Sequence, residues 1–116
     1  MSNLLQKTKG YVEAFNAKDL TAIKLLMAED FSITDPNVSG LSPRADVLKY
    51  ISDIFDNSGK EFCFQAKNIW QSGNITFVEF RLDVGDDKLE GVDIIEWKGE
   101  VMQRLTAYLY PRLRDA

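Results

Sequence analysis

The stretch that decides the fold is residues 31–36, which read Phe-Ser-Ile-Thr-Asp-Pro. Alternate side chains of a β-strand share a face, so Phe31, Ile33 and Asp35 are predicted to lie on one face of a strand. Pro36 lacks a backbone donor and ends the strand, which places Asp35 at its end. Two interpretations follow. In the first, the carboxylate stands on an apolar face, where desolvation raises its pKa and suits it to act as a general base near neutral pH. In the second, the carboxylate turns outward and caps the following loop.

Two helices are predicted before this strand. Between Leu4 and Phe15 the apolar residues recur at intervals of three and four, which is typical of a helix that buries one stripe. Tyr11 lies on that stripe, so its hydroxyl is predicted to point into the protein. Asp19 is placed to cap a second, short helix. The apolar side of this second helix carries Leu20, Ile23, Leu26 and Met27.

A third helix and four strands are predicted after it. The helix follows Ser42, and its inner side carries Val47, Leu48, Ile51, Ile54 and Phe55. The strands are predicted at residues 61–70, 75–84, 89–97 and 100–110, separated by short polar turns. This order predicts an α+β fold, with three helices packed on one face of a curved, mainly antiparallel sheet. We expect one domain over residues 1–116, with residues 110–116 as a polar C-terminal tail.

Composition excludes several classes of partner. The chain has 116 residues and a net charge of −4, and its basic residues form no cluster larger than Arg112-Leu113-Arg114. Nucleic acid and anionic membranes are therefore not expected as partners. No apolar stretch approaches the length that spans a bilayer, and the N-terminus lacks the apolar core of a signal peptide, so a cytoplasmic location is expected.

The chain contains no histidine and one cysteine, Cys63. The absence of histidine excludes Ser-His-Asp and Cys-His catalysis and zinc sites built on imidazole, and no metal site is predicted. A single cysteine cannot form an internal disulfide, and Cys63 is interpreted as a packing residue. Any proton chemistry must therefore use carboxylates, tyrosine or lysine.

Three polar residues are predicted on faces that should be buried: Tyr11, Asp35 and Asp93. Asp93 shares a strand face with Leu89, Gly91, Ile95 and Trp97. Buried polar groups need partners, and one interior could bring the three together. An ionised aspartate could then abstract a proton beside a carbonyl, while a phenol and a neutral acid donate hydrogen bonds to the oxygen. This chemistry needs no metal or cofactor.

The same residues carry a resemblance to a known family. Residues 11–20, 30–36 and 92–97 resemble the NTF2-like superfamily, a cone-shaped α+β fold that includes ketosteroid isomerases and SnoaL-type polyketide cyclases. The resemblance covers nearly the whole chain. It implies that Tyr11 is the tyrosine of an oxyanion hole, Asp35 the general base and Asp93 the protonated acid of the oxyanion hole. It also implies a homodimer formed through the sheet.

Two positions depart from the isomerase pattern. A second tyrosine often supports the first in that family, but its position is Ile51 here, and Tyr50 is turned by about 100° on the helix. Arg104 falls where the isomerases have an apolar pocket residue. It could keep Asp93 ionised, bind an anionic substrate, or face outward if the turn at Lys98-Gly99 changes the register.

We therefore expect a cofactor-free isomerase, cyclase or dehydratase that acts on a small hydrophobic ketone or enone. The alternative is a non-catalytic module that binds a ligand or assembles as a dimer, with a cavity closed by Phe15, Met27, Phe55 and Trp97. The residues expected to contact a substrate are Phe15, Phe55, Val78, Phe80, Leu82, Ile95, Trp97, Arg104 and Tyr108.

Overall fold

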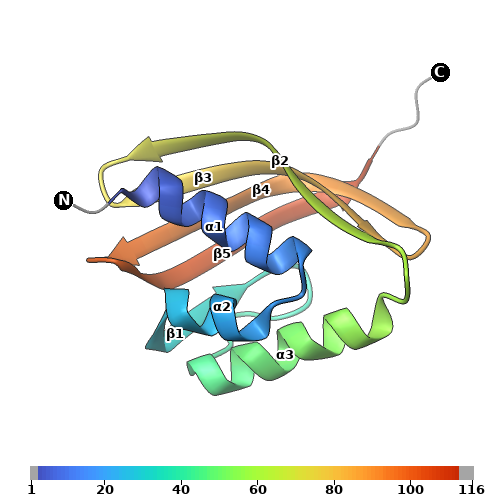
Figure 1. Ribbon diagram of the computed structural model, residues 1–116, viewed down its shortest axis with the longest axis horizontal. Helices are drawn as coiled ribbons and strands as arrows, with labels where there is room; N and C mark the ends of the chain where they lie inside the picture. Colours follow the sequence, from blue (N-terminus) through green and yellow to red (C-terminus); the bar gives the residue numbers. More distant parts are fainter. Residues whose placement is uncertain (1–2, 113–116) are drawn as a thin grey trace.

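The computed structural model describes residues 3–112 and contains three helices and five strands in that range (Figure 1). In chain order they are α1 (Leu4–Asn16), α2 (Leu20–Leu26), β1 (Met27–Thr34), α3 (Arg44–Asn57), β2 (Phe62–Ser72), β3 (Ile75–Val84), β4 (Asp87–Lys98) and β5 (Val101–Pro111). β5 thus continues through the first two residues of the expected tail, and residues 113–116 of that tail lie outside the described residues.

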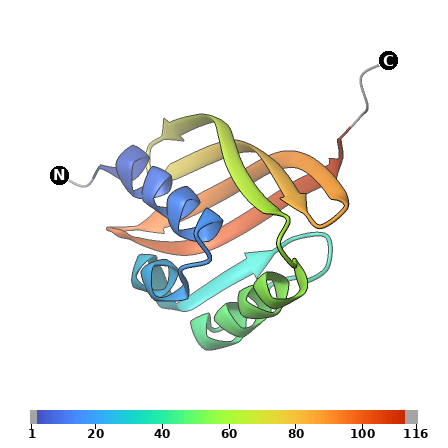
Figure 2. The ribbon, with the colours of Figure 1, turned by 45° about the vertical axis from the view of Figure 1, so that its right-hand side comes forward.

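The five strands form one sheet in the order β1-β5-β4-β3-β2. Strands β2 to β5 pair antiparallel, and β1 runs parallel to β5 at one edge. The sheet curves, and the three helices lie on the same side of it (Figures 1 and 2). The expected α+β architecture is confirmed. In residues 3–112 no helix has both the length and the hydropathy to cross a membrane.

Local sequence explains where the first two helices begin. The side chain of Asn3 accepts a hydrogen bond from the Gln6 backbone at 3.0 Å, and Asp19 accepts one from the Ala22 backbone at 3.1 Å. These side chains satisfy amide groups that lack partners inside the helix. Met27, expected at the end of the second helix, is instead the first residue of β1. Both positions bury its side chain, so periodicity could not distinguish them.

A β-bulge on β5 decides which face its side chains take. Trp97 pairs with Met102, but the preceding residue, Glu96, pairs with Arg104, so Gln103 is the extra residue. A bulge shifts the alternation of side chains by one. Met102 and Leu105 are consequently both buried, whereas Arg104 points to the opposite, outer face.

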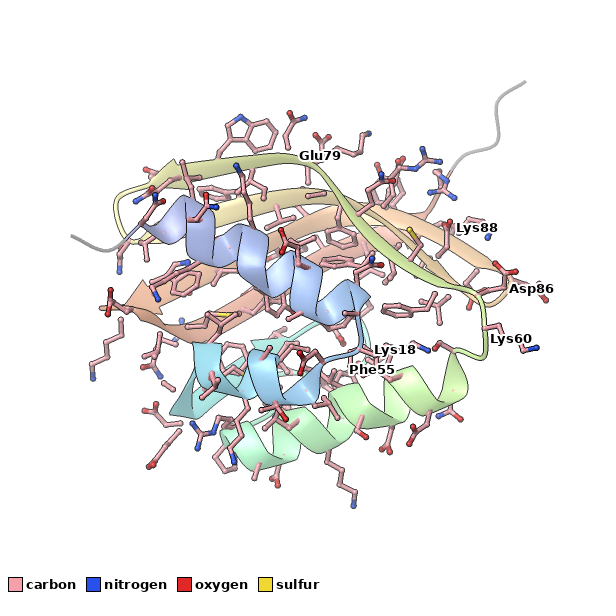
Figure 3. The ribbon with its side chains drawn as sticks, in the orientation of Figure 1. Lys18, Phe55, Lys60, Glu79, Asp86 and Lys88 are labelled. Atoms are coloured by element: carbon pink, nitrogen blue, oxygen red, sulfur yellow. The ribbon has the colours of Figure 1, made fainter. Side chains whose placement is uncertain are left out.

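The core fills the space between the helices and the sheet. At one end, the Thr8 hydroxyl donates to the Thr76 oxygen at 2.8 Å, and the Trp97 indole donates to the same oxygen at 2.9 Å. At another side Lys18 joins the turn between α1 and α2 to the end of α3, near Phe55 (Figure 3). Its ammonium donates to the Ser58 hydroxyl at 2.9 Å. The first bond joins α1 to β3, and the bond from Lys18 joins the α1–α2 turn to the end of α3.

Candidate active site

A cavity of about 370 Å³ lies between the helices and the inner face of the sheet. Tyr11, Asp35 and Asp93 all line it, although they come from α1, the end of β1 and β4. Its other lining residues are mainly apolar: Phe15, Ile33, Pro36, Asn37, Tyr50, Ile51, Ile54, Phe64, Phe80, Leu82, Val84, Asp87, Leu89, Leu105, Ala107, Leu109, Tyr110 and Pro111. The three polar residues singled out in the sequence therefore face one apolar cavity.

Asp93 is the most deeply buried acid in this cavity, with only 5% of its surface exposed. Burial, followed by the negative charge of Asp35, raises the pKa of Asp93 to about 8. Both effects disfavour the ionised form of the carboxyl group. At neutral pH Asp93 is therefore mainly protonated, and its O–H group is a hydrogen-bond donor.

Tyr11 is also buried, with 3% of its surface exposed. Its ring lies 5.8 Å from that of Phe15 and 6.5 Å from that of Phe64, measured between centroids. Burial, and to a lesser extent the charge of Asp93, raises the pKa of the Tyr11 phenol well above its usual value. The phenol therefore stays protonated and is a second donor.

Both donors are available to a ligand. Within residues 3–112 neither the Tyr11 hydroxyl nor the Asp93 carboxyl group has a hydrogen-bond partner for its side-chain atoms. These atoms are nevertheless not fully buried, because Arg112 Nη1 is the sole side-chain nitrogen or oxygen in that range that is both fully buried and unpartnered. The polar atoms of Tyr11 and Asp93 must therefore reach the open space of the cavity. A ligand oxygen placed there could accept two hydrogen bonds from neutral groups.

Asp35 combines features of both interpretations of its sequence. Its Oδ1 accepts hydrogen bonds from the backbone amides of Asn37 at 2.8 Å and Val38 at 3.0 Å, so it does cap the loop after β1. Its Oδ2 accepts a hydrogen bond from the Tyr50 hydroxyl at 2.7 Å. A carboxylate has about four lone-pair sites, so three such bonds leave room for one more acceptor interaction. Asp35 is thus held in place at the cavity wall.

Tyr50 is the site residue that the sequence did not reveal. It lies on α3, half-buried, and its hydroxyl contacts Asp35 rather than Tyr11. Burial, followed by the hydrogen bond to Asp35 and its charge, raises the pKa of Tyr50 to about 12. The phenol therefore remains a donor to Asp35. One signal was available, because Tyr50 shares a helix face with Val47 and Ile54, one turn away on either side.

The apolar residues expected at the site divide into two groups. Phe15, Phe80 and Leu82 line the cavity. Four others lie in the closed core and outside the cavity wall: Phe55, Val78, Ile95 and Trp97. They do share the inner face, as their periodicity predicted. Packing and the Trp97–Thr76 hydrogen bond fill the end of the core around Trp97. The Phe55 ring instead packs beside the cavity, 5.1 Å from that of Phe15 between centroids.

The expectation that Arg104 and Tyr108 contact a substrate in the cavity needs correction. Arg104 is exposed on the outer face and pairs with Glu96 at 3.6 Å, and 64% of the Tyr108 surface is exposed on the same face. The cause is the bulge at Gln103, which turns both residues away from the interior. Of the three alternatives for Arg104, the outward orientation is the one observed.

The raised pKa of the buried Asp93 predicts how the stability of the protein depends on pH, and this prediction can be tested without a substrate. The ordinary pKa of an aspartate side chain is 3.8, so between that pH and about 8 the folded chain keeps a proton that the unfolded chain releases. The free energy of unfolding should therefore fall as pH rises through this window, by on the order of 1 kcal/mol per unit. Urea unfolding from pH 5 to pH 9 should show this fall, and Asp93→Asn should flatten it. Equal slopes for the two proteins would contradict the assignment.

Comparisons with solved structures identify the fold. One similar structure is an NTF2-like protein of unknown function from Cytophaga hutchinsonii. It is 12% identical, the match covers 96% of this chain and 93% of that chain, and the TM-score is 0.83. Another is a SnoaL-like protein of unknown function from Burkholderia thailandensis, which is 17% identical over 95% of this chain and 98% of that chain, with a TM-score of 0.82. A hypothetical protein with a ketosteroid isomerase-like fold from Catenulispora acidiphila, in complex with trimethylamine, has 11% identity, 90% and 85% covered and a TM-score of 0.76. The NTF2-like fold is confirmed.

Comparison of sequences identifies the family. No curated protein matches the chain. The sequence profile of the SnoaL-like domain, however, matches residues 8–105, which include Tyr11, Asp35 and Asp93. The chain therefore belongs to the SnoaL-like domain family.

Proposed function

We propose that the protein is a small-molecule enzyme that transfers a proton next to a carbonyl group, as an isomerase, cyclase or dehydratase of small hydrophobic ketones or enones. One observation supports this most directly. Two neutral donors that have no hydrogen-bond partner in residues 3–112, Tyr11 and Asp93, line the same apolar cavity as the carboxylate of Asp35. The proposal includes no cofactor and no metal.

The proposed mechanism uses each group once. The ketone oxygen accepts hydrogen bonds from Tyr11 and protonated Asp93. Asp35 takes the proton from the carbon next to the carbonyl, and the electron pair of that C–H bond moves to form an enolate. The enolate oxygen becomes negative, so the two donors bind it more strongly than they bind the ketone. The proton on Asp35 then returns to another carbon in an isomerisation, or to the same carbon in simple exchange.

The tyrosine on α3 would serve this mechanism indirectly. The hydrogen bond from Tyr50 and the two backbone amides fix the orientation of the Asp35 carboxylate. A base that is already oriented loses less entropy when the reaction begins. We therefore assign Tyr50 a positioning role.

The alternative is a ligand-binding module without catalysis. It is favoured by the hydrogen bonds to Asp35, because three of the roughly four acceptor sites of this carboxylate are already occupied by protein donors. In that case Asp35 would only organise the loop after β1 and close the cavity around a bound molecule.

Deuterium exchange distinguishes the two functions without knowledge of the natural substrate. β-Tetralone, a small hydrophobic ketone, is incubated with the protein in D₂O, and its mass is followed with time. The proposed function predicts exchange at the carbon next to the carbonyl that is faster than in buffer and that saturates with ketone concentration. Exchange no faster than with heat-unfolded protein, for both β-tetralone and cyclohexenone, would leave only the binding function.

We also propose that the protein forms a homodimer through the outer face of the sheet. This face exposes three large aromatic side chains, Trp70, Tyr108 and Tyr110, each more than half exposed. An exposed apolar patch on a sheet is a common interaction surface. Light scattering at micromolar concentration that gives the monomer mass of 13.2 kDa would contradict the dimer. The cytoplasmic location stays a prediction from the sequence.

A further inference from the structure

We propose that the cavity takes a ligand with an apolar body, an oxygen acceptor at its inner end and an ammonium group at its outer end, and that it discriminates against carboxylates. This inference deepens the proposed function, since it names the class of ligand that the site prefers. It rests on the charges around the cavity and on the acidic residues of a hollow that adjoins it, here called the entrance.

Among residues 3–112, the cavity wall carries acidic residues and no basic ones. Its acids are Asp35, Asp87 and Asp93, and no Lys or Arg of this range lines it. Arg104, which could have bound an anion, is on the outer face with Glu96. An anionic ligand would therefore enter without a counter-ion and would lose its hydration, which is costly.

The entrance adds acidic charge. A shallow hollow adjoins the cavity and shares four residues with it: Tyr50, Ile54, Val84 and Asp87. It adds Asp53 and Asn57, from the same helix as Tyr50. Asp53 and Asp87 are exposed, and neither is in an ion pair within residues 3–112. Two carboxylates thus line the hollow that adjoins the cavity, one on α3 and one at the start of β4.

In residues 3–112 the basic residues that neighbour these acids in the chain make no ion pair with them. Lys88 directly follows Asp87, but its ammonium nitrogen lies 3.8 Å from Asp83 Oδ2. Arg112 follows the lining residue Pro111, but its guanidinium donates to Asp83 at 2.8 Å. Lys49 lies one turn before Asp53 on α3, and in the described part of the chain it makes no ion pair. The carboxylates at the entrance therefore keep their charge available for a cation.

Two further features indicate a built site rather than a chance group of acids. Asp93 is 5% exposed, has no hydrogen-bond partner in residues 3–112 and lines the inner end of the cavity, where it awaits an acceptor. At the outer end the ring of Tyr50 lines both the cavity and the hollow. An aromatic face beside carboxylates is a typical environment for an ammonium group. The site is therefore polar at both ends and apolar between them.

A matched set of three ligands tests the proposal. The ligands are acetophenones that carry a para substituent: trimethylammonium, the neutral and nearly isosteric tert-butyl group, or carboxylate. Affinities are measured by calorimetry at low salt. We expect the trimethylammonium ligand to bind at least about tenfold more tightly than the carboxylate, with the tert-butyl ligand between them, because a single charge pair near a protein surface contributes roughly this much. Raising the salt concentration to about 0.5 M should reduce the ratio.

Variants at the entrance locate the effect. Asp87→Asn and Asp53→Asn should each reduce the preference for the cation over the carboxylate several-fold and leave the affinity for the tert-butyl ligand unchanged. The control is Asp86→Asn, since Asp86 is the neighbour of Asp87 in the same turn but lines neither the cavity nor the hollow (Figure 3). It should leave the preference unchanged.

Several outcomes would overturn the proposal. They are equal affinities for the charged ligands, an Asp86→Asn effect as large as that of Asp87→Asn, or no binding of any of the three ligands at millimolar concentration. The result is separable from the proposed reaction. If the three ligands bind in the expected order of affinity but no deuterium exchange occurs, this inference stands and catalysis is refuted. If exchange occurs but the ligands show no charge preference, catalysis stands and this inference is refuted.

Discussion

Asp35→Asn is expected to lower the rate of enzyme-catalysed deuterium exchange by roughly 10²–10⁴-fold, the usual contribution of a positioned acid or base. The amide oxygen of asparagine can still accept the two backbone hydrogen bonds that Oδ1 accepts from Asn37 and Val38. At the Oδ2 position the amide nitrogen cannot accept the hydrogen bond from Tyr50, although it can donate one to the Tyr50 oxygen. The side chain also loses its charge and its ability to take a proton. The rate should therefore fall while the loop after β1 keeps its conformation.

Asp30→Asn is the matched control for this variant. Asp30 lies on β1, five residues before Asp35, but it is exposed, accepts a hydrogen bond from Gln103 at 2.9 Å and does not line the cavity. Its substitution should leave the exchange rate unchanged. Circular dichroism should show that both variants are folded. An active protein whose Asp35→Asn variant keeps its rate would refute the mechanism.

Gly91→Ala is expected to lower the free energy of unfolding by more than about 4 kcal/mol, an effect that few single substitutions reach. Gly91 is buried on β4 opposite Leu109 of β5. A Cβ atom at this position would overlap the backbone carbonyl oxygen of Tyr108 and would lie 2.7 Å from the Leu109 Cα atom. Backbone atoms of a paired strand cannot move aside without breaking the sheet.

Gly10→Ala is the control for the same chemical change. Gly10 lies within α1, and a Cβ atom there would meet nothing within 4 Å. Alanine has the higher helix propensity, so this variant should be more stable than the wild type, by up to about 1 kcal/mol. Urea unfolding monitored by circular dichroism measures both variants. A Gly91→Ala protein within about 1 kcal/mol of the wild type would show that β4 and β5 are farther apart than described.

The close approach at Gly91 also bears on function. Glycine lets β4 and β5 lie unusually close at this point, and such a position in a strand commonly marks a bend. The neighbouring inward positions on β4 are Leu89 and Asp93, both of which line the cavity. The sheet that carries Asp93 thus depends on a residue without a side chain.

Sequence patterns predicted much of the fold, because the signals involved are local. The period of three to four residues placed Tyr11 on the buried side of α1, and alternation placed Asp35 and Asp93 on the inner side of their strands. The side chain of Asp19 marked the start of α2 through its hydrogen bond from the Ala22 backbone, three residues away. Each of these features depends on neighbours in the chain.

Other features depend on residues that are distant in the chain, and the sequence alone did not determine them. The bulge at Gln103 exists only in the pairing of β5 with β4, and it turned Arg104 and Tyr108 to the outer face. The Tyr50–Asp35 hydrogen bond forms only once α3 has packed against β1.

Periodicity determined that Asp93 faces inward, but the protonation of Asp93 required the tertiary structure. Its pKa depends on how completely the helices and the sheet exclude water and on the nearby charge of Asp35. The same holds for the cavity itself. Ile95 and Leu105 are both apolar and face inward, but Ile95 fills the core whereas Leu105 also lines the cavity. The difference depends on how the surrounding side chains pack, which no local sequence pattern encodes.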